Sequence, residues 1–243
     1  MRFKAALVSK AGGRKANEDF ASFSEKKGYG CYLVADGLGG HRGGALASKR
    51  ACESIIEAFH NSPGASVNHL VRYLEYAGKA MDDLQKELGL PDAAKTTLVV
   101  LLASRSGKVT WAHIGDSRLY YFRKNSLAFQ TKDHSLPQRL VDVGEISPDQ
   151  VRFHEDRNRL LSVFTDHDIS RFTYLNKIIS IKRGDAFLLC SDGFWDYINE
   201  DEMVNALKTT KKPELWLSRM EVKLLLRATG KYDNYTALAV LVR

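Results

Sequence analysis

The chain has 243 residues, 44% of them hydrophobic and 27% charged, which excludes an intrinsically disordered protein and is enough for one sizeable core. Lys and Arg outnumber Asp and Glu by 36 to 29, but the net charge of +7 comes without a basic run longer than a pair and without a zinc or RNA-binding motif, so we expect no nucleic-acid partner. Three cysteines are too few for a disulfide framework, and no apolar run approaches the length of a membrane span.

The first part of the chain predicts three strands. Residues 2–10 form the first strand, and the second lies near residues 20–24, after a polar loop. The third lies in the segment 31–40, where a short apolar and aromatic run bounded by turn residues leads into Asp36. Asp36 is therefore expected at the end of a buried strand.

The residues around Asp36 favour a cation site. The glycines that follow let the backbone turn sharply and let a ligand approach closely. A carboxylate beside a bare backbone carbonyl at a rigid strand end suits a hard cation such as Mg²⁺ or Mn²⁺. A single Asp-Gly pair is also typical of an ordinary tight turn, so this motif alone leaves both interpretations open.

Two helices follow this strand. Apolar residues recur at helical spacing over residues 43–61 and again over 66–88. We expect neither helix to carry chemistry. His60 and His69 have no partner at the spacing of metal ligands, which favours solvated or packing roles for both.

The second half of the chain returns to strands. We expect them at residues 97–103, 108–114, 118–123, 127–130, 172–179, 185–190 and 235–242, with a helix at 213–228. The polar stretch 134–158 contains only short helical pieces, around 136–143 and 148–151. One interpretation of Asp116 is an acid in a hairpin turn between two of these strands.

Four acids share one setting, the end of a predicted strand. Asp36 and Asp192 each end an apolar run and precede a glycine, Asp116 follows a weaker run, and Asp233 precedes the last strand. Four carboxylates on one rim of a sheet would repel one another unless cations compensated their charge. This recurrence favours a metal-binding rim more strongly than any single motif does.

Six short motifs carry a family resemblance. They are Arg14-Lys15-Ala16-Asn17-Glu18-Asp19, Asp36-Gly37-Leu38-Gly39-Gly40-His41, Lys95-Thr96-Thr97-Leu98, Gly115-Asp116-Ser117-Arg118, Ser191-Asp192-Gly193 and Asp233-Asn234-Tyr235-Thr236. In this order and spacing they resemble the metal-dependent protein phosphatases of type 2C, over nearly the whole chain. The glycines after Asp36 resemble the compact bacterial branch of that family.

The resemblance implies a fold of the α+β class. It is a four-layer αββα sandwich, in which helices on both outer faces cover two mainly antiparallel sheets. The resemblance also implies one catalytic domain over residues 1–243, with a flap at about 134–160 beside the active site. The alternation of strands and helices along the chain agrees with sheet layers covered by helices.

The resemblance further implies two Mn²⁺ or Mg²⁺ ions, with a third in some family members. Asp36 would bridge the first two ions, Gly37 would contribute its backbone carbonyl, and Asp192 and Asp233 would complete the first ion. A hydroxide that bridges the ions would attack phosphorus, because the ions neutralise the substrate and generate the nucleophile near neutral pH. Asp116 would bind the third ion, unless it is only a turn acid.

The first motif would handle substrate and water. Arg14 resembles the family's phosphate clamp, since its planar fork matches two phosphate oxygens. A solvated loop arginine is the alternative. Glu18 and Asp19 would hold coordinated waters, or one of them would bind an ion directly.

Other residues would support the metal rim. Asn234 would orient the acid before it, and Thr97 and Ser191 would hold neighbouring groups in place. Arg157-Asn158 resembles the family's flap anchor and is also compatible with an ordinary surface pair.

Two residues depart from the family pattern. Leu38 stands where animal members have a histidine that protonates the leaving alcohol, so a metal-bound water would be the donor here. His41 lies three residues further on and is not assigned that role. Lys95 stands where a small residue is usual, which would alter the rim of the site.

These features favour a metal-dependent serine/threonine protein phosphatase that reverses the action of a bacterial Ser/Thr kinase on its protein targets. The alternative is a non-catalytic signalling domain of the same fold, which the loss of a metal acid would mark; every expected acid is present. A third candidate is an aspartyl-phosphate phosphotransferase, which needs a second Asp two residues after the nucleophilic one. Leu38 occupies that position and argues against this activity. We expect a cytoplasmic protein without membrane contact, because the first apolar run is too short for a signal sequence. We also expect a monomer.

Overall fold

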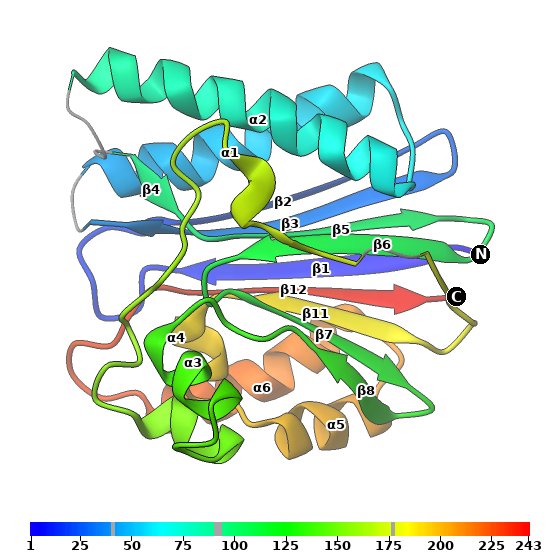
Figure 1. The fold of residues 1–243 in the computed structure, drawn as a ribbon. Helices are drawn as coiled ribbons and strands as arrows, with labels where there is room; N and C mark the ends of the chain where they lie inside the picture. Colours follow the sequence, from blue (N-terminus) through cyan, green and yellow to red (C-terminus); the bar gives the residue numbers. More distant parts are fainter. Residues whose placement is uncertain (40–41, 90–93, 176–177) are drawn as a thin grey trace.

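Two β-sheets packed face to face form the centre of the molecule, and helices cover both outer faces (Figure 1). The computed structural model describes residues 1–39, 42–89, 94–175 and 178–243. The four-layer αββα sandwich expected from the sequence is therefore confirmed.

The first sheet joins the two ends of the chain. Its strands lie in the order β1 (Phe3–Lys10), β12 (Tyr235–Val242), β11 (Ala186–Cys190), β7 (Arg118–Arg123) and β8 (Ser126–Gln130). Every neighbouring pair is antiparallel. β1 is one edge of this sheet, and the last strand of the chain lies beside it.

The second sheet is also antiparallel. Its strands lie in the order β10 (Ile179–Ser180), β6 (Lys108–Ile114), β5 (Leu98–Ser104), β3 (Tyr29–Leu38) and β2 (Asp19–Lys26). Two short strands add to it: β4 (Lys95–Thr96) pairs with β3, and β9 (Thr173–Tyr174) pairs with β6.

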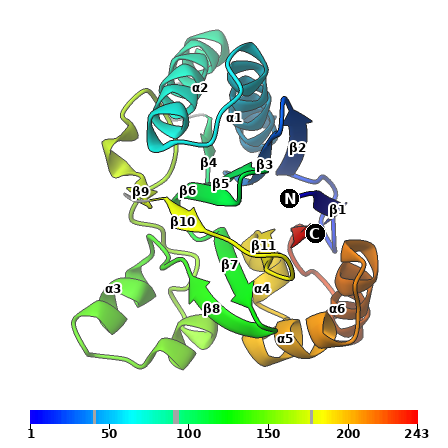
Figure 2. The ribbon, with the colours of Figure 1, turned by 90° about the vertical axis from the view of Figure 1, so that its right-hand side faces the viewer.

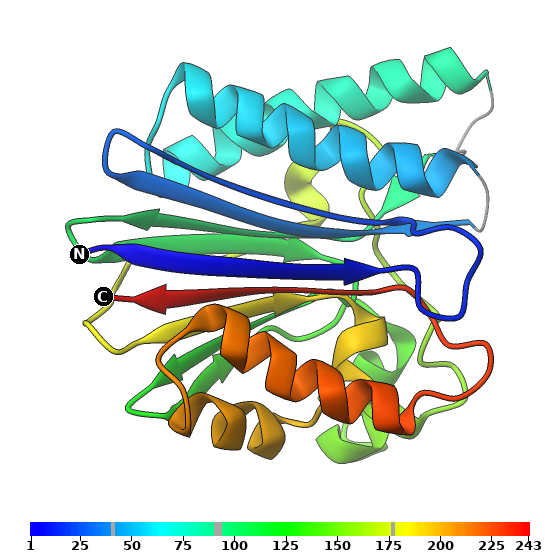
Figure 3. The same cartoon turned by 180° about the vertical axis from the view of Figure 1, so that it is seen from behind.

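Helices cover each sheet from outside, as Figures 2 and 3 show. The second sheet is covered by α1 (Arg42–Asn61) and α2 (Val67–Leu88), and the first by α4 (Asp192–Trp195), α5 (Glu200–Lys208) and α6 (Pro213–Arg227). The flap contains α3 (Leu136–Asp142) and the 3-10 helix η1 (Pro148–Phe153), and a second 3-10 helix, η2 (Ile169–Arg171), lies near α2.

The side chains of the central strands alternate between two cores. Along β3, Tyr32 and Val34 point into the core between the sheets, whereas Leu33 and Ala35 pack under α1 and α2. β5 is a continuous apolar run because both of its faces are covered. This burial makes the ends of β3 and β5 a rigid base for polar residues.

The sequence prediction misses α5 and misjudges one strand. The start of α5 carries a capping box, in which Asn199 accepts from the Glu202 N–H at 2.9 Å and Glu202 accepts from the Asn199 N–H at 3.3 Å. The single strand expected at residues 172–179 is wrong, since β9 and β10 are separate short strands that pair with different parts of β6.

β6 and β7 do not form the hairpin suggested for Asp116. β6 belongs to the second sheet and β7 to the first, so the chain crosses between the sheets at residues 115–117. Gly115 has a φ of 90°, which favours glycine, and a Cβ at this position would overlap Thr97. Asp116 therefore lies at the junction of the two sheets.

Both chain ends lie at one end of the sandwich (Figure 1). There Arg2 and Arg243 exchange two backbone hydrogen bonds of 2.7 Å, which extends the pairing of β1 with β12. Among the residues that the structure describes, no helix combines the length and the apolar character needed to cross a bilayer.

Candidate metal centre

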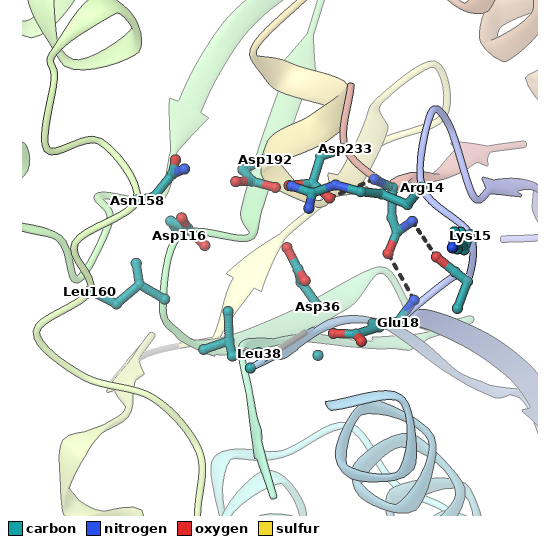
Figure 4. Close-up of a pocket in the computed structure, with 14 residues that line it drawn as sticks. Arg14, Lys15, Glu18, Asp36, Leu38, Asp116, Asn158, Leu160, Asp192 and Asp233 are labelled. Carbon is teal, nitrogen blue, oxygen red and sulfur yellow. Dashed lines mark hydrogen bonds and ion pairs between the residues drawn. The ribbon is translucent and has the colours of Figure 1, made fainter. Parts of the chain in front are cut away.

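A pocket lies at the end of the sandwich away from the chain termini, and four predicted acids meet in it (Figure 4). Its lining residues are Arg14, Lys15, Ala16, Glu18, Asp36, Gly37, Leu38, Gly39, Asp116, Asn158, Leu160, Asp192, Asp233 and Asn234. Of the site residues expected from the sequence, Asp19, Thr97 and Ser191 do not line the pocket and lie behind its wall.

Each acid reaches the pocket from a different part of the fold. Asp36 comes from β3 in the second sheet, and Asp116 comes from the crossing between the sheets. Asp192 is the first residue of α4 after β11, and Asp233 precedes β12 in the first sheet. The pocket is therefore built where the ends of both sheets come together.

The backbone of Asp36 is held on both sides. Its N–H donates to the Thr97 hydroxyl at 3.0 Å, and its carbonyl accepts from the Thr97 N–H and the Thr96 hydroxyl, each at 2.8 Å. The Thr97 hydroxyl also contacts that of Ser117 at 2.7 Å, next to Asp116. The strand does not end at Asp36, as the sequence suggested, because Gly37 and Leu38 continue the ladder against β4.

Gly37 occupies a position where no other residue fits. Its N–H donates to the Glu18 carbonyl at 3.1 Å. A Cβ at this position would overlap the backbone of Gly44 and approach the Glu18 carbonyl. The close approach of three chain segments therefore requires glycine beside Asp36, and it leaves the Gly37 backbone at the pocket wall.

Asp19 is buried behind the pocket and pairs in register with Asp36 across β2 and β3. One carboxylate oxygen accepts from the Ser191 hydroxyl at 2.7 Å. The other oxygen, Oδ1, is buried and accepts no hydrogen bond from the residues that the structure describes. Ser191 also accepts from the Thr236 N–H at 3.0 Å, which ties the start of α4 to β12.

Asn234 fastens the first loop to the start of β12. Its side-chain amide donates to the carbonyls of Ala11 and Ala16, both at 2.8 Å, and its Oδ1 accepts from the Glu18 N–H at 2.8 Å. Its own N–H donates to Asp233 at 2.8 Å. Asn234 thus positions the loop that carries Arg14 as well as the neighbouring acid.

A buried group behind Asp116 was not anticipated from the sequence. The Trp195 indole N–H donates to the Asp116 carbonyl at 2.9 Å, and the Arg118 guanidinium lies 3.4 Å from the centre of a Trp195 ring. Arg118 in turn makes two hydrogen bonds, of 2.8 and 2.7 Å, to Asp133. Arg118 belongs to a motif singled out in the sequence, but nothing there links it to Trp195.

The acids of the pocket destabilise one another's charge. Burial and then the charges of neighbouring acids, Asp19 first, raise the pKa of Asp36 well above its usual value. Burial is also the main cause that raises the pKa of Asp192 to about 7 and of Asp19 to about 6. Burial and the charge of Asp192 raise the pKa of Asp116 as well.

Arg14 already offsets part of this charge. Its guanidinium lies 2.9 Å from an oxygen of Asp233, and both side chains are partly exposed at the pocket mouth (Figure 4). The planar fork of an arginine can pair with a carboxylate or with a phosphate. Arg14 is therefore in place to bind an anion that enters the pocket.

The flap reaches the opposite side of the pocket mouth. Asn158 and Leu160 line the pocket there, and Arg157 pairs with Asp196 at 3.3 Å, at the end of α4. Leu38, which stands where animal type 2C phosphatases have a histidine, also lines the pocket. His41 lies outside the described residues, and Lys95 pairs with Leu38 in the β4 ladder.

The residues present fit divalent cations. The pocket offers carboxylate oxygens and a backbone carbonyl, which hard cations prefer. Burial first and the charges of neighbouring acids second raise the pKa of Asp36 and of Asp192, and a bound cation would stabilise the charged form of both. Among the described residues, no group of three or more His, Cys, Asp or Glu side chains is arranged to hold one ion.

Comparison with known proteins identifies relatives of this architecture. Serine/threonine phosphatase stp of Listeria welshimeri is 30% identical over 240 residues, covering 93% of this chain and 90% of that protein. Serine/threonine protein phosphatase PstP of Mycobacterium tuberculosis is 30% identical over 229 residues, covering 93% of this chain but 42% of PstP. This chain therefore spans about two-fifths of the length of that relative.

A solved structure has a fold similar to that of this chain. The catalytic domain of PstP in complex with two manganese ions superposes with a TM-score of 0.82 at 28% identity and covers 99% of both chains. The sequence model described as Protein phosphatase 2C matches residues 9–224. Since this match takes in most of the chain, including Asp36, Asp116 and Asp192, the chain belongs to the protein phosphatase 2C family.

Proposed function

We propose that this chain is a metal-dependent serine/threonine protein phosphatase, which hydrolyses phosphoserine and phosphothreonine in proteins. The observation that carries the proposal is the meeting of Asp36, Asp116, Asp192 and Asp233 in one pocket, with Arg14 at its mouth. An enzyme that cleaves a phosphate ester must neutralise the charge of the ester and supply a nucleophile, and this arrangement can do both.

The metal ligands follow from the donors at the pocket wall. Asp36, the Gly37 carbonyl, Asp192 and Asp233 would hold two Mn²⁺ or Mg²⁺ ions, as the family resemblance implies. Asp116 is the candidate ligand of a third ion. When bound, such ions supply charge neutralisation and activate water as a nucleophile near neutral pH. The two manganese ions in the PstP structure support this assignment.

The protein's own groups position the substrate and the ligands. Arg14 leaves Asp233 and takes two oxygens of the phosphate, which holds the ester in one orientation over the carboxylates. Thr97 keeps the backbone of Asp36 fixed, and Asn234 fixes the loop that carries Arg14. Glu18 and Asp19 orient water at the rim and behind it.

Proton transfer to the leaving group differs from the pattern of animal relatives. Leu38 lines the pocket and has no proton to give. Within the described part of the chain, the pocket lining contains no histidine, tyrosine or cysteine. We propose that the leaving oxygen of serine or threonine takes its proton from water.

The substrates that fit this function are phosphorylated proteins, among them a Ser/Thr kinase and its targets. We further propose that the chain acts as a monomer in the cytoplasm, without nucleic acid or membrane. The phosphatase names of its relatives support the substrate class. The net charge of +7 is compatible with negatively charged phosphoproteins.

The experiment that tests the proposal is phosphate release from a phosphothreonine peptide with Mn²⁺, with and without chelator. We expect turnover with the metal and none with the chelator. The absence of turnover with both Mn²⁺ and Mg²⁺, on several phosphopeptides, would favour the alternative of a non-catalytic signalling domain. Retention of a partner protein without turnover would identify that alternative directly.

A further inference from the structure

A hollow at the end of the sandwich opposite the metal pocket is lined by cationic side chains. They are Arg2, Lys4, Arg105, Arg183 and Arg243, beside Met1 and Phe3. Among the described residues, only Arg105 in this group has an acidic partner, with Glu25 at 3.6 Å. The side chains that line the hollow therefore carry an excess of positive charge.

Such a hollow attracts anionic groups. Clustered like charges repel one another, and a bound anion relieves this repulsion. Four of the five cations are arginines, whose planar forks pair with carboxylates and phosphates through two hydrogen bonds. The ligand indicated by this chemistry is a segment with several negative charges.

An open strand edge leads from this hollow to the metal pocket. β1 starts at Phe3 in the hollow and ends at Lys10, close before the loop of Arg14 (Figure 3). It is the last strand of its sheet. In an antiparallel pair, every second residue exchanges both backbone hydrogen bonds with its partner, and the residues between them point their N–H and C=O groups away from the partner strand. Arg2 exchanges both bonds with Arg243, so the residues that point away from β12 begin with Phe3. The backbone groups that face the open edge belong to Phe3, Ala5, Leu7 and Ser9.

A groove runs beside this edge. It is lined by residues 6–10 of β1 and by Glu214, Leu217, Ser218 and Glu221 of α6. Leu7 is exposed, which offers an apolar contact at the middle of the edge. The two glutamates disfavour acidic residues in this middle part, so negative charge on a bound segment belongs at the hollow.

We propose that the phosphoprotein substrate binds as an added strand along β1. An acidic cluster of the same substrate, several residues away from its phosphorylated residue, then lies in the basic hollow. This inference rests on the proposed function. The exposed backbone of an edge strand recognises extended polypeptide by main-chain hydrogen bonds, which favours a protein over a nucleic acid as the occupant. The metal pocket takes the phosphorylated residue, and the hollow at the start of β1 selects substrates that carry the acidic cluster.

The geometry sets the spacing of the acidic cluster. Eight residues of β1 at about 3.3 Å per residue extend over roughly 23 Å. The cluster therefore lies about 8 to 12 residues from the phosphorylated residue, since the substrate must also pass the loop before Arg14. Antiparallel pairing is the more stable kind, and it places the cluster on the C-terminal side.

Steady-state kinetics with three phosphothreonine peptides test this directly. One peptide has four glutamates centred 10 residues after the phosphothreonine, one has them 10 residues before it, and one has glutamines instead. We expect the first peptide to have a KM roughly tenfold below that of the third, with kcat unchanged. Equal KM values for the first and third, or a lower KM for the second, would overturn the proposal.

Matched variants locate the effect. The triple variant Arg2→Gln, Lys4→Gln and Arg183→Gln should remove the tenfold advantage of the first peptide and leave the glutamine peptide unaffected. The control variant Lys49→Gln, Arg72→Gln and Lys79→Gln on α1 and α2 lowers the net charge equally and should change neither. Equal losses in both triple variants would mean that net charge alone attracts the peptide, and the hollow would have no role.

A binding measurement separates this inference from the proposed function. Fluorescence anisotropy of an unphosphorylated acidic peptide, with the protein in chelator, should show salt-dependent binding that the Arg2, Lys4 and Arg183 substitutions weaken. Leu7→Pro removes one outward N–H without breaking the β1–β12 ladder, and it should weaken binding as well. Tighter binding of an oligonucleotide of equal charge would overturn the assignment to protein. Failure of the proposed function would instead abolish turnover of every peptide while this binding remained.

Discussion

The carboxylate of Asp36 is flanked by Asp19, Asp116 and Asp192, and their charges raise its pKa in addition to the effect of burial. Without cations, this cluster opposes folding. We predict that Asp36→Asn abolishes hydrolysis but raises the free energy of unfolding of the metal-free protein by about 1–3 kcal/mol at pH 7, because burial and the neighbouring acids penalise the charged carboxylate and the amide carries no charge. Chemical denaturation in chelator measures the second effect. A variant less stable than the parent in chelator would show that Asp36 stabilises the fold by other contacts.

Arg14 makes its ion pair with Asp233 at the mouth of the pocket, where phosphate would enter. We predict that Arg14→Ala weakens binding of the phosphate group by roughly 1.5–3 kcal/mol, the value of a charge-assisted hydrogen bond. The Michaelis constant and inhibition by inorganic phosphate should both report this loss, and Arg14→Lys should recover only part of it. Unchanged values for both measurements would show Arg14 to be a bystander.

The sequence identified the residues of the pocket better than it identified their supports. The strand-end pattern found Asp36, Asp192 and Asp233 because each adjoins an apolar strand or a glycine. It did not show that Asp19 would be buried behind the pocket, since that position depends on the pairing of β2 with β3. The contact of Trp195 with Asp116 joins residues 79 positions apart, and no local pattern encodes it.

At the scale of elements, Glu202 joins α5 to α6. Its carboxylate caps α5 at Asn199, lies 3.0 Å from Lys223 and pairs with Arg227 at 2.7 Å. Hydrogen bonding to Arg227 is the main cause that lowers the pKa of Glu202 to about 2. The capping box was present in the sequence, but the ion pairs needed α6 to be in place.

This pKa predicts a pH-dependent contribution to stability. The carboxylate binds its proton less readily in the folded chain than in the unfolded chain, so its contribution is complete above a pH of about 4.5 and is lost as the pH falls towards 2. We predict that Glu202→Gln lowers the free energy of unfolding by about 1 kcal/mol at pH 7 and by less at pH 3. Urea denaturation at both pH values measures the difference. A constant difference would assign the effect to packing.

The flap is attached to the body by a few polar contacts. Arg152 pairs with Glu200 at 3.1 Å and Arg157 with Asp196 at 3.3 Å, while Phe153 at the end of η1 is 81% exposed. Loops of this kind commonly carry binding residues on a rigid scaffold. The flap is therefore the segment that we expect to contact the proposed protein substrate beside the pocket.

We predict that exchanging residues 136–156 for the flap of a related enzyme changes the preference among phosphopeptides. Hydrolysis of a small aryl phosphate should stay nearly unchanged, because that substrate reaches only the metals and Arg14. The control is the parent enzyme assayed on both substrates at equal metal concentration. Equal losses on both substrates would mean that the flap shapes the metal site itself.

At the scale of the whole molecule, the layer architecture followed from the family motifs and from the alternation of strands and helices. The order of strands did not follow, because β12 joins β1 across the entire chain length. Non-local pairing also explains why the hairpin interpretation of Asp116 was wrong. β6 and β7 are adjacent in sequence but belong to different sheets. Local patterns thus located the strand ends, while long-range pairing brought those ends together.

If the pocket binds the proposed ions, the meeting of these strand ends confines that binding to the folded molecule. Asp36, Asp192 and Asp233 come from separate segments, so the unfolded chain cannot offer them to one ion. We predict that Mn²⁺ at a hundred times its dissociation constant raises the free energy of unfolding by about 2.7 kcal/mol, and that chelator reverses this gain and stops hydrolysis. Thermal denaturation with and without Mn²⁺ measures the shift. In Asp192→Asn the shift should shrink or vanish, whereas in Lys79→Gln on α2 it should persist. An equal shift in Asp192→Asn would place the stabilising ion elsewhere in the molecule.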